Sequence, residues 1–360
     1  MKNIIVFISC LLIISCGSGG GGGSSNNSIT LNLTPTGEPL EDASKIGISF
    51  PPVTQYPEMN FTLPHLQRLA VSKVKYSENW KFREPEKGTY NWAPLDERIA
   101  YISDNNLSLM LNILTDAPDW ACSEVSNIKN CVFESEDDFR TYISTLLQRH
   151  PNKISQIQFG SEWDNIDIYP GTAEDYVRFF NIFHDEVKKH SPDTEVVLGG
   201  ISKLYPIGVL ANLGGQLTFD KLTLTDITAV HEYVYGLASR KDTVIPRVEY
   251  VLKNATYDAV DLYLYDDYEN WGKYTYVMQQ KTTRPIIVSE FGGPHPEFEI
   301  DTDAYQAEKL FQYLETIKSL PIKDAYYFKL VDNYSSFHQK SGLINIVLEE
   351  KLSYDIFMAR

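Results

Sequence analysis

Two glutamates stand at places where paired carboxylates can do chemistry. Glu162 closes the β-prone run "KISQIQFGSE", and Glu290 closes the run "RPIIVSE". Two carboxyl groups that meet in one site can cleave a glycosidic bond, because one protonates the leaving oxygen while the other attacks or stabilises the anomeric carbon. A single glutamate is usually a solvated surface residue. Two that each end an apolar run form a candidate catalytic pair.

The elements that must bring these glutamates together alternate along the chain. Stretches with the apolar spacing of amphipathic helices, such as 135–150, 173–190 and 302–320, separate most of the β-prone runs. This βαβα rhythm predicts a (β/α)8 TIM barrel, in which catalytic residues gather at the C-terminal ends of the strands. A doubly wound open sheet is the alternative, but no G-x-G-x-x-G motif follows an early strand. The eight expected strands lie within residues 45–50, 71–77, 107–115, 153–160, 194–200, 258–265, 284–290 and 324–330.

A ninth β-prone run, "DITAVHEYV" at residues 226–234, competes for a place in the barrel. The segment "TVIPRVEYVLKN", residues 243–254, has helical spacing and leads directly into the run at 258–265. We therefore assign 258–265 to the sixth strand and 226–234 to an insertion after the fifth.

Several motifs resemble those of glycoside hydrolases of clan A. The segment "ENWKFREPEKGTYNWAPLD", residues 78–96, is similar to their W-x-x-x-E-P-x-x-G-x-Y-x-W-x-x-L-D signature. "APDW" resembles their P-x-W element, "RPIIVSEFGG" their nucleophile strand and "SGLINIVLEEKLSYDIF" their closing segment. The resemblance runs from about residue 46 to the end of the sequence and is greatest to the xylosidase, iduronidase and galactosidase branches.

This resemblance implies a retaining glycosidase with a carbohydrate substrate, no cofactor and no metal. Glu162 would be the acid/base and Glu290 the nucleophile of a double displacement. A proton donor needs a pKa above that of a free carboxyl group, so we expect partial burial beside Trp163 to raise the pKa of Glu162. A glycan-binding barrel that has lost turnover is the alternative function.

Two residues depart from the clan pattern. Ser161 stands where these enzymes usually have an asparagine that holds the sugar 2-hydroxyl, and Lys75 stands where many have an arginine. Both are candidate substrate-binding residues. Further candidates are aromatic residues at or just beyond strand ends, where a ring can stack on a pyranose, although core packing is an equally common role for each: Trp80, Trp120, Trp163, Tyr265 and Trp271. We also expect Tyr265 to hydrogen-bond Glu290.

The N-terminal residues have the pattern of a targeting segment. Residues 1–15 hold Lys2 and a short apolar run, and the sequence around Cys16 resembles a bacterial lipobox, which predicts lipidation of Cys16. Residues 16–44 are the expected lipidated Gly/Ser-rich tether, and residues 45–360 form the expected (β/α)8 catalytic domain. We expect a lipid-anchored protein of the cell envelope. Its resemblance to Gram-negative lipoproteins predicts sorting to the outer membrane. An ordinary secretory signal is the alternative.

Charge and the remaining cysteines limit the partners. The formal net charge of −16 argues against nucleic acid, and no later run is apolar enough to cross a membrane, so a lipid would be the only membrane contact. Cys122 and Cys131, nine residues apart in a polar loop, are expected to form a disulfide, with two free thiols as the alternative. The sugar, the linkage and the oligomeric state are left open.

Overall fold

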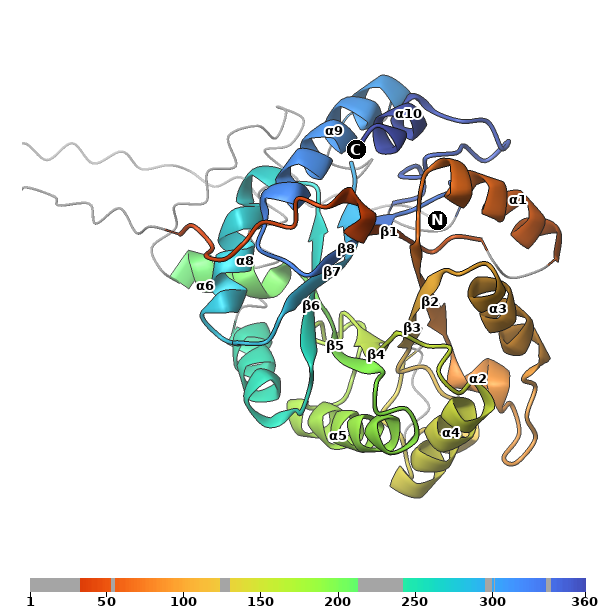
Figure 1. Cartoon of the computed structure of the whole chain (residues 1–360). Coiled ribbons are helices and arrows are strands. Elements are labelled where there is room, and N and C mark those ends of the chain that lie inside the picture. The colour runs from red at the N-terminus through yellow and green to blue at the C-terminus, as the bar shows by residue number, and fades with distance from the viewer. Residues whose placement is uncertain are drawn as a thin grey trace, which may run out of the picture. The chain divides into compact units, whose positions relative to one another are not determined.

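The structure is a computed structural model that describes residues 33–52, 56–123, 130–212, 242–294, 300, 302–334 and 338–360. The chain divides into two units, Met1–Asn32 and Leu33–Arg360. In the second unit, eight parallel strands close into a barrel in the order of the sequence, with helices around it (Figure 1). The predicted TIM barrel is therefore confirmed.

Each predicted run overlaps one barrel strand, and four of the strands end one or two residues beyond the predicted run. The strands are β1 (Ile46–Ser49), β2 (Lys73–Glu78), β3 (Ser108–Ile113), β4 (Gln156–Ser161), β5 (Glu195–Ile201), β6 (Ala259–Tyr265), β7 (Ile286–Gly292) and β8 (Asp324–Phe328). The barrel closes where β8 pairs with β1, with Ala325 beside Ile46. The sixth strand is the run that we assigned to it, and residues 226–234 lie outside the described part of the chain.

Helices surround the strands, and those expected at 135–150, 173–190, 243–254 and 302–320 begin and end close to the predicted positions. They are α1 (Tyr56–Arg68), α2 (Trp80–Arg83), α3 (Ala93–Asp104), α4 (Glu136–Arg149), α5 (Ala173–His190), α6 (Leu204–Asn212), a helix over 242–254, α8 (Trp271–Gln279), α9 (Asp303–Ser319) and α10 (Leu352–Met358). Local chemistry fixes several starts. Thr172 and Asp175 form a capping box at the start of α5, and Ser135 accepts from the backbone of Asp138 at the start of α4. No helix in the described residues is long and apolar enough to span a membrane.

The barrel interior changes character along the strands. Met110, Val197, Ala259, Ile287 and Tyr326 form one buried apolar cluster. Side chains two positions further along a strand share the same face, and there β3, β6 and β7 carry buried polar residues instead. These are Asn112, Asp261 and Ser289. The interior thus becomes polar toward the C-terminal ends of the strands, where the glutamates lie.

The segment before β1 belongs to the folded unit. Leu40 is buried and donates its backbone N–H to the carbonyl of Leu320, and Thr36 exchanges two hydrogen bonds with Gln279. Residues 33–44, which the sequence analysis placed in the tether, therefore pack on the barrel. The sequence analysis extended the tether too far, because residues 33–44 have few apolar side chains and follow directly after the Gly/Ser-rich run.

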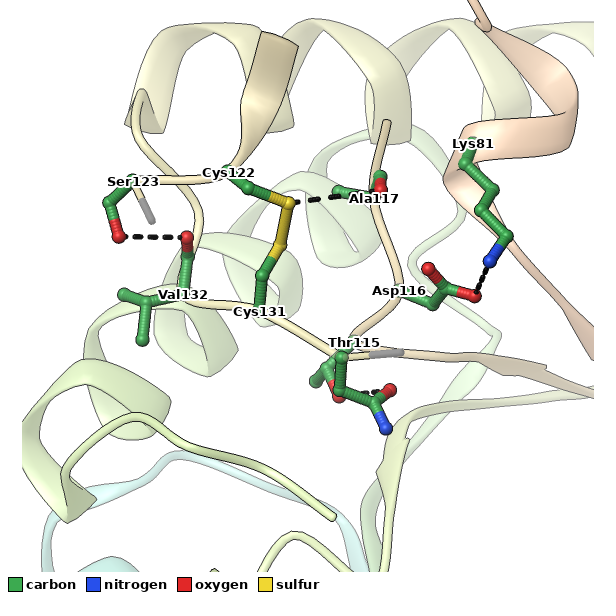
Figure 2. Close-up of a disulfide and its surroundings, with 9 residues drawn as sticks. Lys81, Thr115, Asp116, Ala117, Cys122, Ser123, Cys131 and Val132 are labelled. Atoms are coloured by element: carbon green, nitrogen blue, oxygen red, sulfur yellow. Dashed lines mark hydrogen bonds and ion pairs between the residues drawn. A yellow bond between two sulfur atoms is a disulfide. The ribbon is translucent and has the colours of Figure 1, made fainter. Parts of the chain in front are cut away.

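The predicted disulfide is confirmed. Cys122 and Cys131 are joined at a Cα–Cα distance of 5.7 Å, in the connection between β3 and α4 (Figure 2). Beside it, Ser123 donates its backbone N–H to the carbonyl oxygen of Val132 at 2.9 Å. The disulfide and this hydrogen bond close the base of the loop.

Candidate active site

Glu162 follows the last residue of β4 in an uncommon backbone conformation. Its φ is +49°, and its backbone N–H donates to the carbonyl of Gly200 on β5 at 2.8 Å. A non-glycine residue in this region is strained by on the order of 1 kcal/mol or more, and such strain is concentrated at functional sites. This strained conformation lies directly after β4, at the C-terminal end of the strand.

The surroundings of Glu162 favour its protonated form. Loss of hydration, followed by the negative charges of Asp164 and Glu290, raises the pKa of Glu162 to about 8, and Lys75 and Lys203 oppose this shift only in part. Because the charge of Glu290 contributes, the two carboxyl groups are close enough to affect one another. Glu162 is thus suited to carry a proton at neutral pH.

Glu290 is held from both sides on β7. The residue is 8% exposed, Oε1 accepts a hydrogen bond from Nζ of Lys75 at 2.8 Å, and Oε2 accepts one from the hydroxyl of Tyr265 at 2.6 Å. The predicted contact between Tyr265 and Glu290 is confirmed. Its pairing with a lysine and a hydroxyl donor suits an ionised, oriented carboxylate.

All three protons of the Lys75 ammonium group have acceptors. Nζ lies 2.8 Å from Oε1 of Glu290, 2.8 Å from Oγ of Ser289 and 2.9 Å from the hydroxyl of Tyr263. The hydroxyl of Ser289 in turn donates to Asp261 at 2.5 Å. Lys75, predicted to bind substrate, is fully buried and reaches the nucleophile candidate instead. It would act on substrate through Glu290.

Tyr263 connects Lys75 to Ser161 through its hydroxyl group. Burial, with the charges of Glu290 and Asp261, holds the pKa of Tyr263 well above its ordinary value, so the hydroxyl keeps its proton. That oxygen accepts from Lys75 and lies 3.0 Å from Oγ of Ser161, where either hydroxyl group can be the donor. When Tyr263 is the donor, the hydroxyl proton of half-buried Ser161 is available to another acceptor.

Sequence reasoning missed Tyr263. The signal was its position two residues before Tyr265 on one strand, which puts both side chains on the same face. Gly200 provides the space for it, because a Cβ there would lie 2.1 Å from the Tyr263 ring.

Three of the predicted stacking residues have no accessible ring face. Trp80 is 1% exposed, and Trp163 and Trp271 are 0% exposed. Trp163 stacks on Tyr176 of α5 at 4.3 Å and donates its indole N–H to the carbonyl of Gly199. This burial argues against sugar stacking by these tryptophans, because a strand-end position does not determine whether a ring turns to the mouth or to the surrounding helices. Nor is Trp163 among the main causes of the raised pKa of Glu162.

The two remaining stacking candidates, Tyr265 and Trp120, lie in different environments. The Tyr265 ring is 9% exposed and stacks on the His338 ring at 4.1 Å. Trp120 is half-buried, and its indole N–H donates to the backbone carbonyl of Glu84 at 3.2 Å. Tyr265 therefore lies at the candidate catalytic pair, whereas Trp120 packs on the clan-like segment after β2.

That segment, residues 78–96, has a structural role in this chain. The carboxylate of Glu84 accepts from the indole of Trp80 and from the backbone of Gly88, both at 2.8 Å. The Trp92 ring stacks between Tyr90 and Tyr142. The most specific motif of the sequence therefore builds the connection from β2 to α3.

Other acidic residues near the mouth have hydrogen-bond or ion-pair partners within the protein. Asp164 accepts from the backbone and hydroxyl of Ser202, and Lys203 lies 3.2 Å from both Asp266 and Asp267. Within the described ranges, no group of three or more His, Cys, Asp or Glu residues is placed to hold a metal ion. The predicted lipidation residue, Cys16, lies outside those ranges.

The comparisons with known proteins support the fold. No protein-family model matches the chain, and the search of curated proteins gave no significant match. Among solved structures, the chain is similar to a family 39 glycoside hydrolase from the gut symbiont Bacteroides cellulosilyticus WH2. The match has 12% identity and a TM-score of 0.57, and it covers 89% of this chain and 63% of that one.

Two further solved structures have a similar barrel. The exo-beta-1,4-mannosidase Op5Man5 from Opitutaceae bacterium strain TAV5 matches at 14% identity and a TM-score of 0.60, over 87% of this chain and 58% of that one. The GH5_18 protein from Streptomyces cattleya, in complex with GlcNAc, matches at 11% identity and a TM-score of 0.62, over 87% of this chain and 78% of that one. The chain thus spans about three fifths of the first two relatives. It has the barrel fold of these glycoside hydrolases, which confirms the resemblance at the level of the fold.

Proposed function

We propose that this protein is a retaining glycoside hydrolase that cleaves a poly- or oligosaccharide. The observation that carries the proposal is the contrast between the two carboxyl groups. The pKa of Glu162 is raised to about 8, whereas Glu290 is paired with Lys75 and receives a hydrogen bond from Tyr265. One group is arranged to give a proton and the other to attack. A purely glycan-binding barrel has no need for this contrast.

The proposed reaction has two steps. In the first, the Glu290 carboxylate attacks the anomeric carbon, the glycosidic bond breaks, and the proton of Glu162 passes to the leaving oxygen. In the second, Glu162 takes a proton from water, the water oxygen attacks the same carbon, and the bond to Glu290 breaks. Two displacements restore the original anomeric configuration.

The structure offers a way to balance charge along this path. While Glu290 is esterified, its negative charge is lost, and Lys75 keeps hydrogen-bond acceptors in Ser289 and Tyr263. At the same stage Glu162 has become the charged carboxylate. The loss of the Glu290 charge lowers the pKa of Glu162, because one of the causes that raised it has gone.

We further propose that the protein acts from the cell envelope. The lipobox-like sequence around Cys16 and the Gly/Ser-rich run after it support a lipid anchor with a flexible tether. A carbohydrate substrate outside the cell is consistent with this position. The GlcNAc bound to the Streptomyces cattleya relative also supports this class of substrate.

Hydrolysis assays test the function. The wild type, Glu290→Gln and the matched control Glu97→Gln are incubated with a panel of nitrophenyl glycosides and polysaccharides. Glu97 is an exposed residue of α3. We expect the wild type and the control to hydrolyse the same substrates and Glu290→Gln to lose turnover while remaining folded. An active Glu290→Gln protein, or a wild type that binds glycans and hydrolyses none, would contradict the proposal.

A further inference from the structure

A pocket of about 630 Å³ has Phe328, the last residue of β8, in its lining, and its volume is within the range of small-molecule sites. It is formed where β1 and β8 meet, by the β1–α1 connection, α1 and the segment after β8. The lining residues on which the argument depends are Phe50, Glu58, Phe61, Phe328, Lys329 and Asp332.

Phe328 connects this pocket to the nucleophile candidate. Its ring contacts the ring of Tyr265 edge-on at a centroid distance of 6.0 Å, and Tyr265 donates to Glu290. On the other side, the Phe328 ring contacts Phe50 at 5.3 Å. The pocket is thus one aromatic ring away from a residue that touches the reacting carboxylate.

The order of strands determines which part of a substrate reaches this pocket. In a closed barrel of eight strands in sequence order, β4 and β8 stand opposite one another. Glu162 follows β4, so a leaving group that takes its proton departs over that side. The sugars that stay attached to Glu290 then extend toward β8 and β1, which lie across the barrel from β4 (Figure 1). The pocket is lined by residues at the ends of these two strands.

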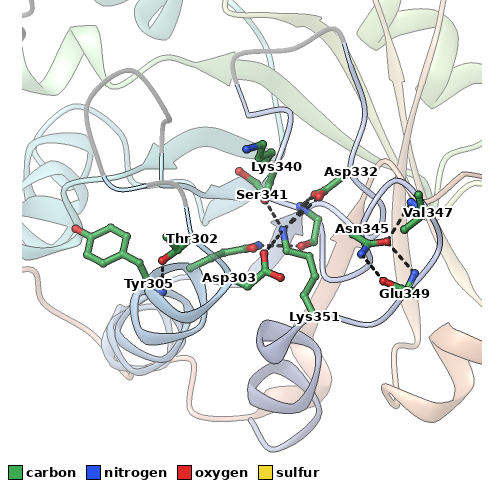
Figure 3. Close-up of polar contacts among 12 residues, drawn as sticks. Thr302, Asp303, Tyr305, Asp332, Lys340, Ser341, Asn345, Val347, Glu349 and Lys351 are labelled. Carbon is green, nitrogen blue, oxygen red and sulfur yellow. Dashed lines mark hydrogen bonds and ion pairs between the residues drawn. The ribbon is translucent and has the colours of Figure 1, made fainter.

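The lining suits a sugar ring. Phe50 and Phe61 present apolar surface for the C–H face of a pyranose, and Glu58 and Asp332 provide acceptors for its hydroxyl groups. The pocket floor is held in place, because Asp332 accepts from the backbone of Gly342 at 2.7 Å and pairs with Lys351 at 3.3 Å (Figure 3).

The charges of the lining favour a neutral sugar. The carboxyl groups of Glu58 and Asp332 lie with Lys329 in the lining, and Lys351 pairs with Asp332 at 3.3 Å. Two negative and two positive groups thus balance, so the pocket has no excess positive charge that would attract a carboxylate or sulfate on the sugar.

We propose that this pocket binds a neutral sugar residue on the retained side of the bond, next to the sugar that reacts. This inference rests on the proposed function and makes it more specific. The enzyme prefers substrates with at least two sugars before the cleaved bond, and it releases products of at least two sugars from that side.

Matched nitrophenyl glycosides test this inference. The kcat/KM is measured for the β-glucoside, β-xyloside, β-mannoside and β-galactoside and for glycosides of the corresponding β-1,4-linked disaccharides, with one further disaccharide whose outer sugar is a uronate. We expect the best neutral disaccharide to exceed its monosaccharide by about tenfold or more, because binding energy from the remote sugar is used at the reacting one. The uronate should not gain this advantage.

Two variants link the preference to the pocket. Phe50→Ala removes one aromatic wall, and Asn333→Trp fills the space from an exposed lining position. Each should lower the ratio of the two kcat/KM values by about fivefold. The control Phe82→Ala, at a 52% exposed residue of α2 outside the pocket, should keep the ratio.

The outcomes separate the two proposals. If the wild type hydrolyses both kinds of glycoside equally well, or if the variants lower both rates alike, the inference is wrong and the proposed function stands. If the wild type hydrolyses none of the glycosides or polysaccharides, the proposed function fails and the inference fails with it.

Discussion

The Nζ atom of Lys75 lies 2.9 Å from the hydroxyl oxygen of Tyr263 and 2.8 Å from Oε1 of Glu290. One buried cation therefore orients both the nucleophile candidate and, through Tyr263, the hydroxyl of Ser161. Ser161 precedes Glu162 directly, so this set of hydrogen bonds joins the two sides of the site. When Tyr263 is the donor in this contact, the hydroxyl proton of Ser161 is available to a substrate oxygen near the reacting carbon.

A double-mutant cycle tests this chain of hydrogen bonds. Ser161→Ala and Tyr263→Phe should each lower kcat/KM, and the double variant should lose less than the sum of the two, with a coupling on the order of 1 kcal/mol. Ser161→Thr, which keeps a hydroxyl group, should restore part of the activity. A 2-deoxy aryl glycoside lacks the sugar 2-hydroxyl group, the expected acceptor for Ser161. With this substrate, Ser161→Ala should lower kcat/KM by a smaller factor. Strictly additive losses, unchanged with the 2-deoxy substrate, would show that the two residues act separately.

The raised pKa of Glu162 predicts a loss of activity at alkaline pH. The protonated form is the proton donor, so kcat/KM should fall as the pH rises through about 8, following titration of Glu162 in the free enzyme. A dinitrophenyl glycoside, whose leaving group needs no proton, should show a weaker decline. An alkaline limb of equal steepness for both leaving groups would assign the titration to another residue.

The same shift predicts a dependence of stability on pH. The folded state binds the Glu162 proton up to about pH 8, whereas an unfolded carboxyl releases it near its ordinary pKa of 4.5. The folded state therefore binds more protons between these limits, and the stability contribution, complete below the lower limit, is lost as the pH rises to the upper one. Glu162→Gln removes this loss, worth at most a few kcal/mol.

The measurement is the melting temperature of Glu162→Gln minus that of the wild type. The difference should increase from pH 5 to pH 9. The matched control Glu97→Gln, at an exposed residue, should show no such trend. A difference that stays constant over this range would mean that Glu162 titrates normally.

The disulfide should contribute to stability more than to catalysis. Closing a loop with a sequence separation of 9 restricts the unfolded chain, by about 2–3 kcal/mol in the loop-entropy model. Cys122→Ser combined with Cys131→Ser should lower the denaturant midpoint accordingly and keep kcat within a few fold. Urea titration of both proteins measures the difference, and equal midpoints would show that the bridge has no stabilising effect.

Cys16→Ala tests the anchor. In the proposed anchor, Cys16 is the residue that carries the lipid. The variant should therefore leave the membrane fraction and appear in the soluble envelope fraction. Ser18→Ala serves as the matched control and should stay membrane-bound. Unchanged membrane association of Cys16→Ala after fractionation would exclude lipid anchoring at this residue.

Periodicity predicted the fold well because most strands are buried on both faces and read as short apolar runs. The boundaries of β6 and α5 agree with the sequence for this reason. The catalytic candidates could also be found, because a carboxylate that ends such a run is conspicuous. The sequence does not determine which way a side chain points beyond the end of a strand. Trp163 and Glu162 are neighbours in sequence but lie in different environments. Trp163 packs against α5, whereas Glu162 interacts with Glu290.

The central claim is that Glu290 forms a covalent bond to the sugar while Glu162 handles protons. The most direct measurement uses Glu162→Gln with dinitrophenyl glycosides of the sugars that the wild type accepts. The first step needs no proton from Glu162 with this leaving group, and the second step lacks its base, so a glycosyl-enzyme should accumulate. Peptide mass spectrometry should then find one glycosyl residue on Glu290, and azide should release a glycosyl azide of retained configuration. An adduct on another residue, or a wild-type product of inverted configuration, would contradict the account.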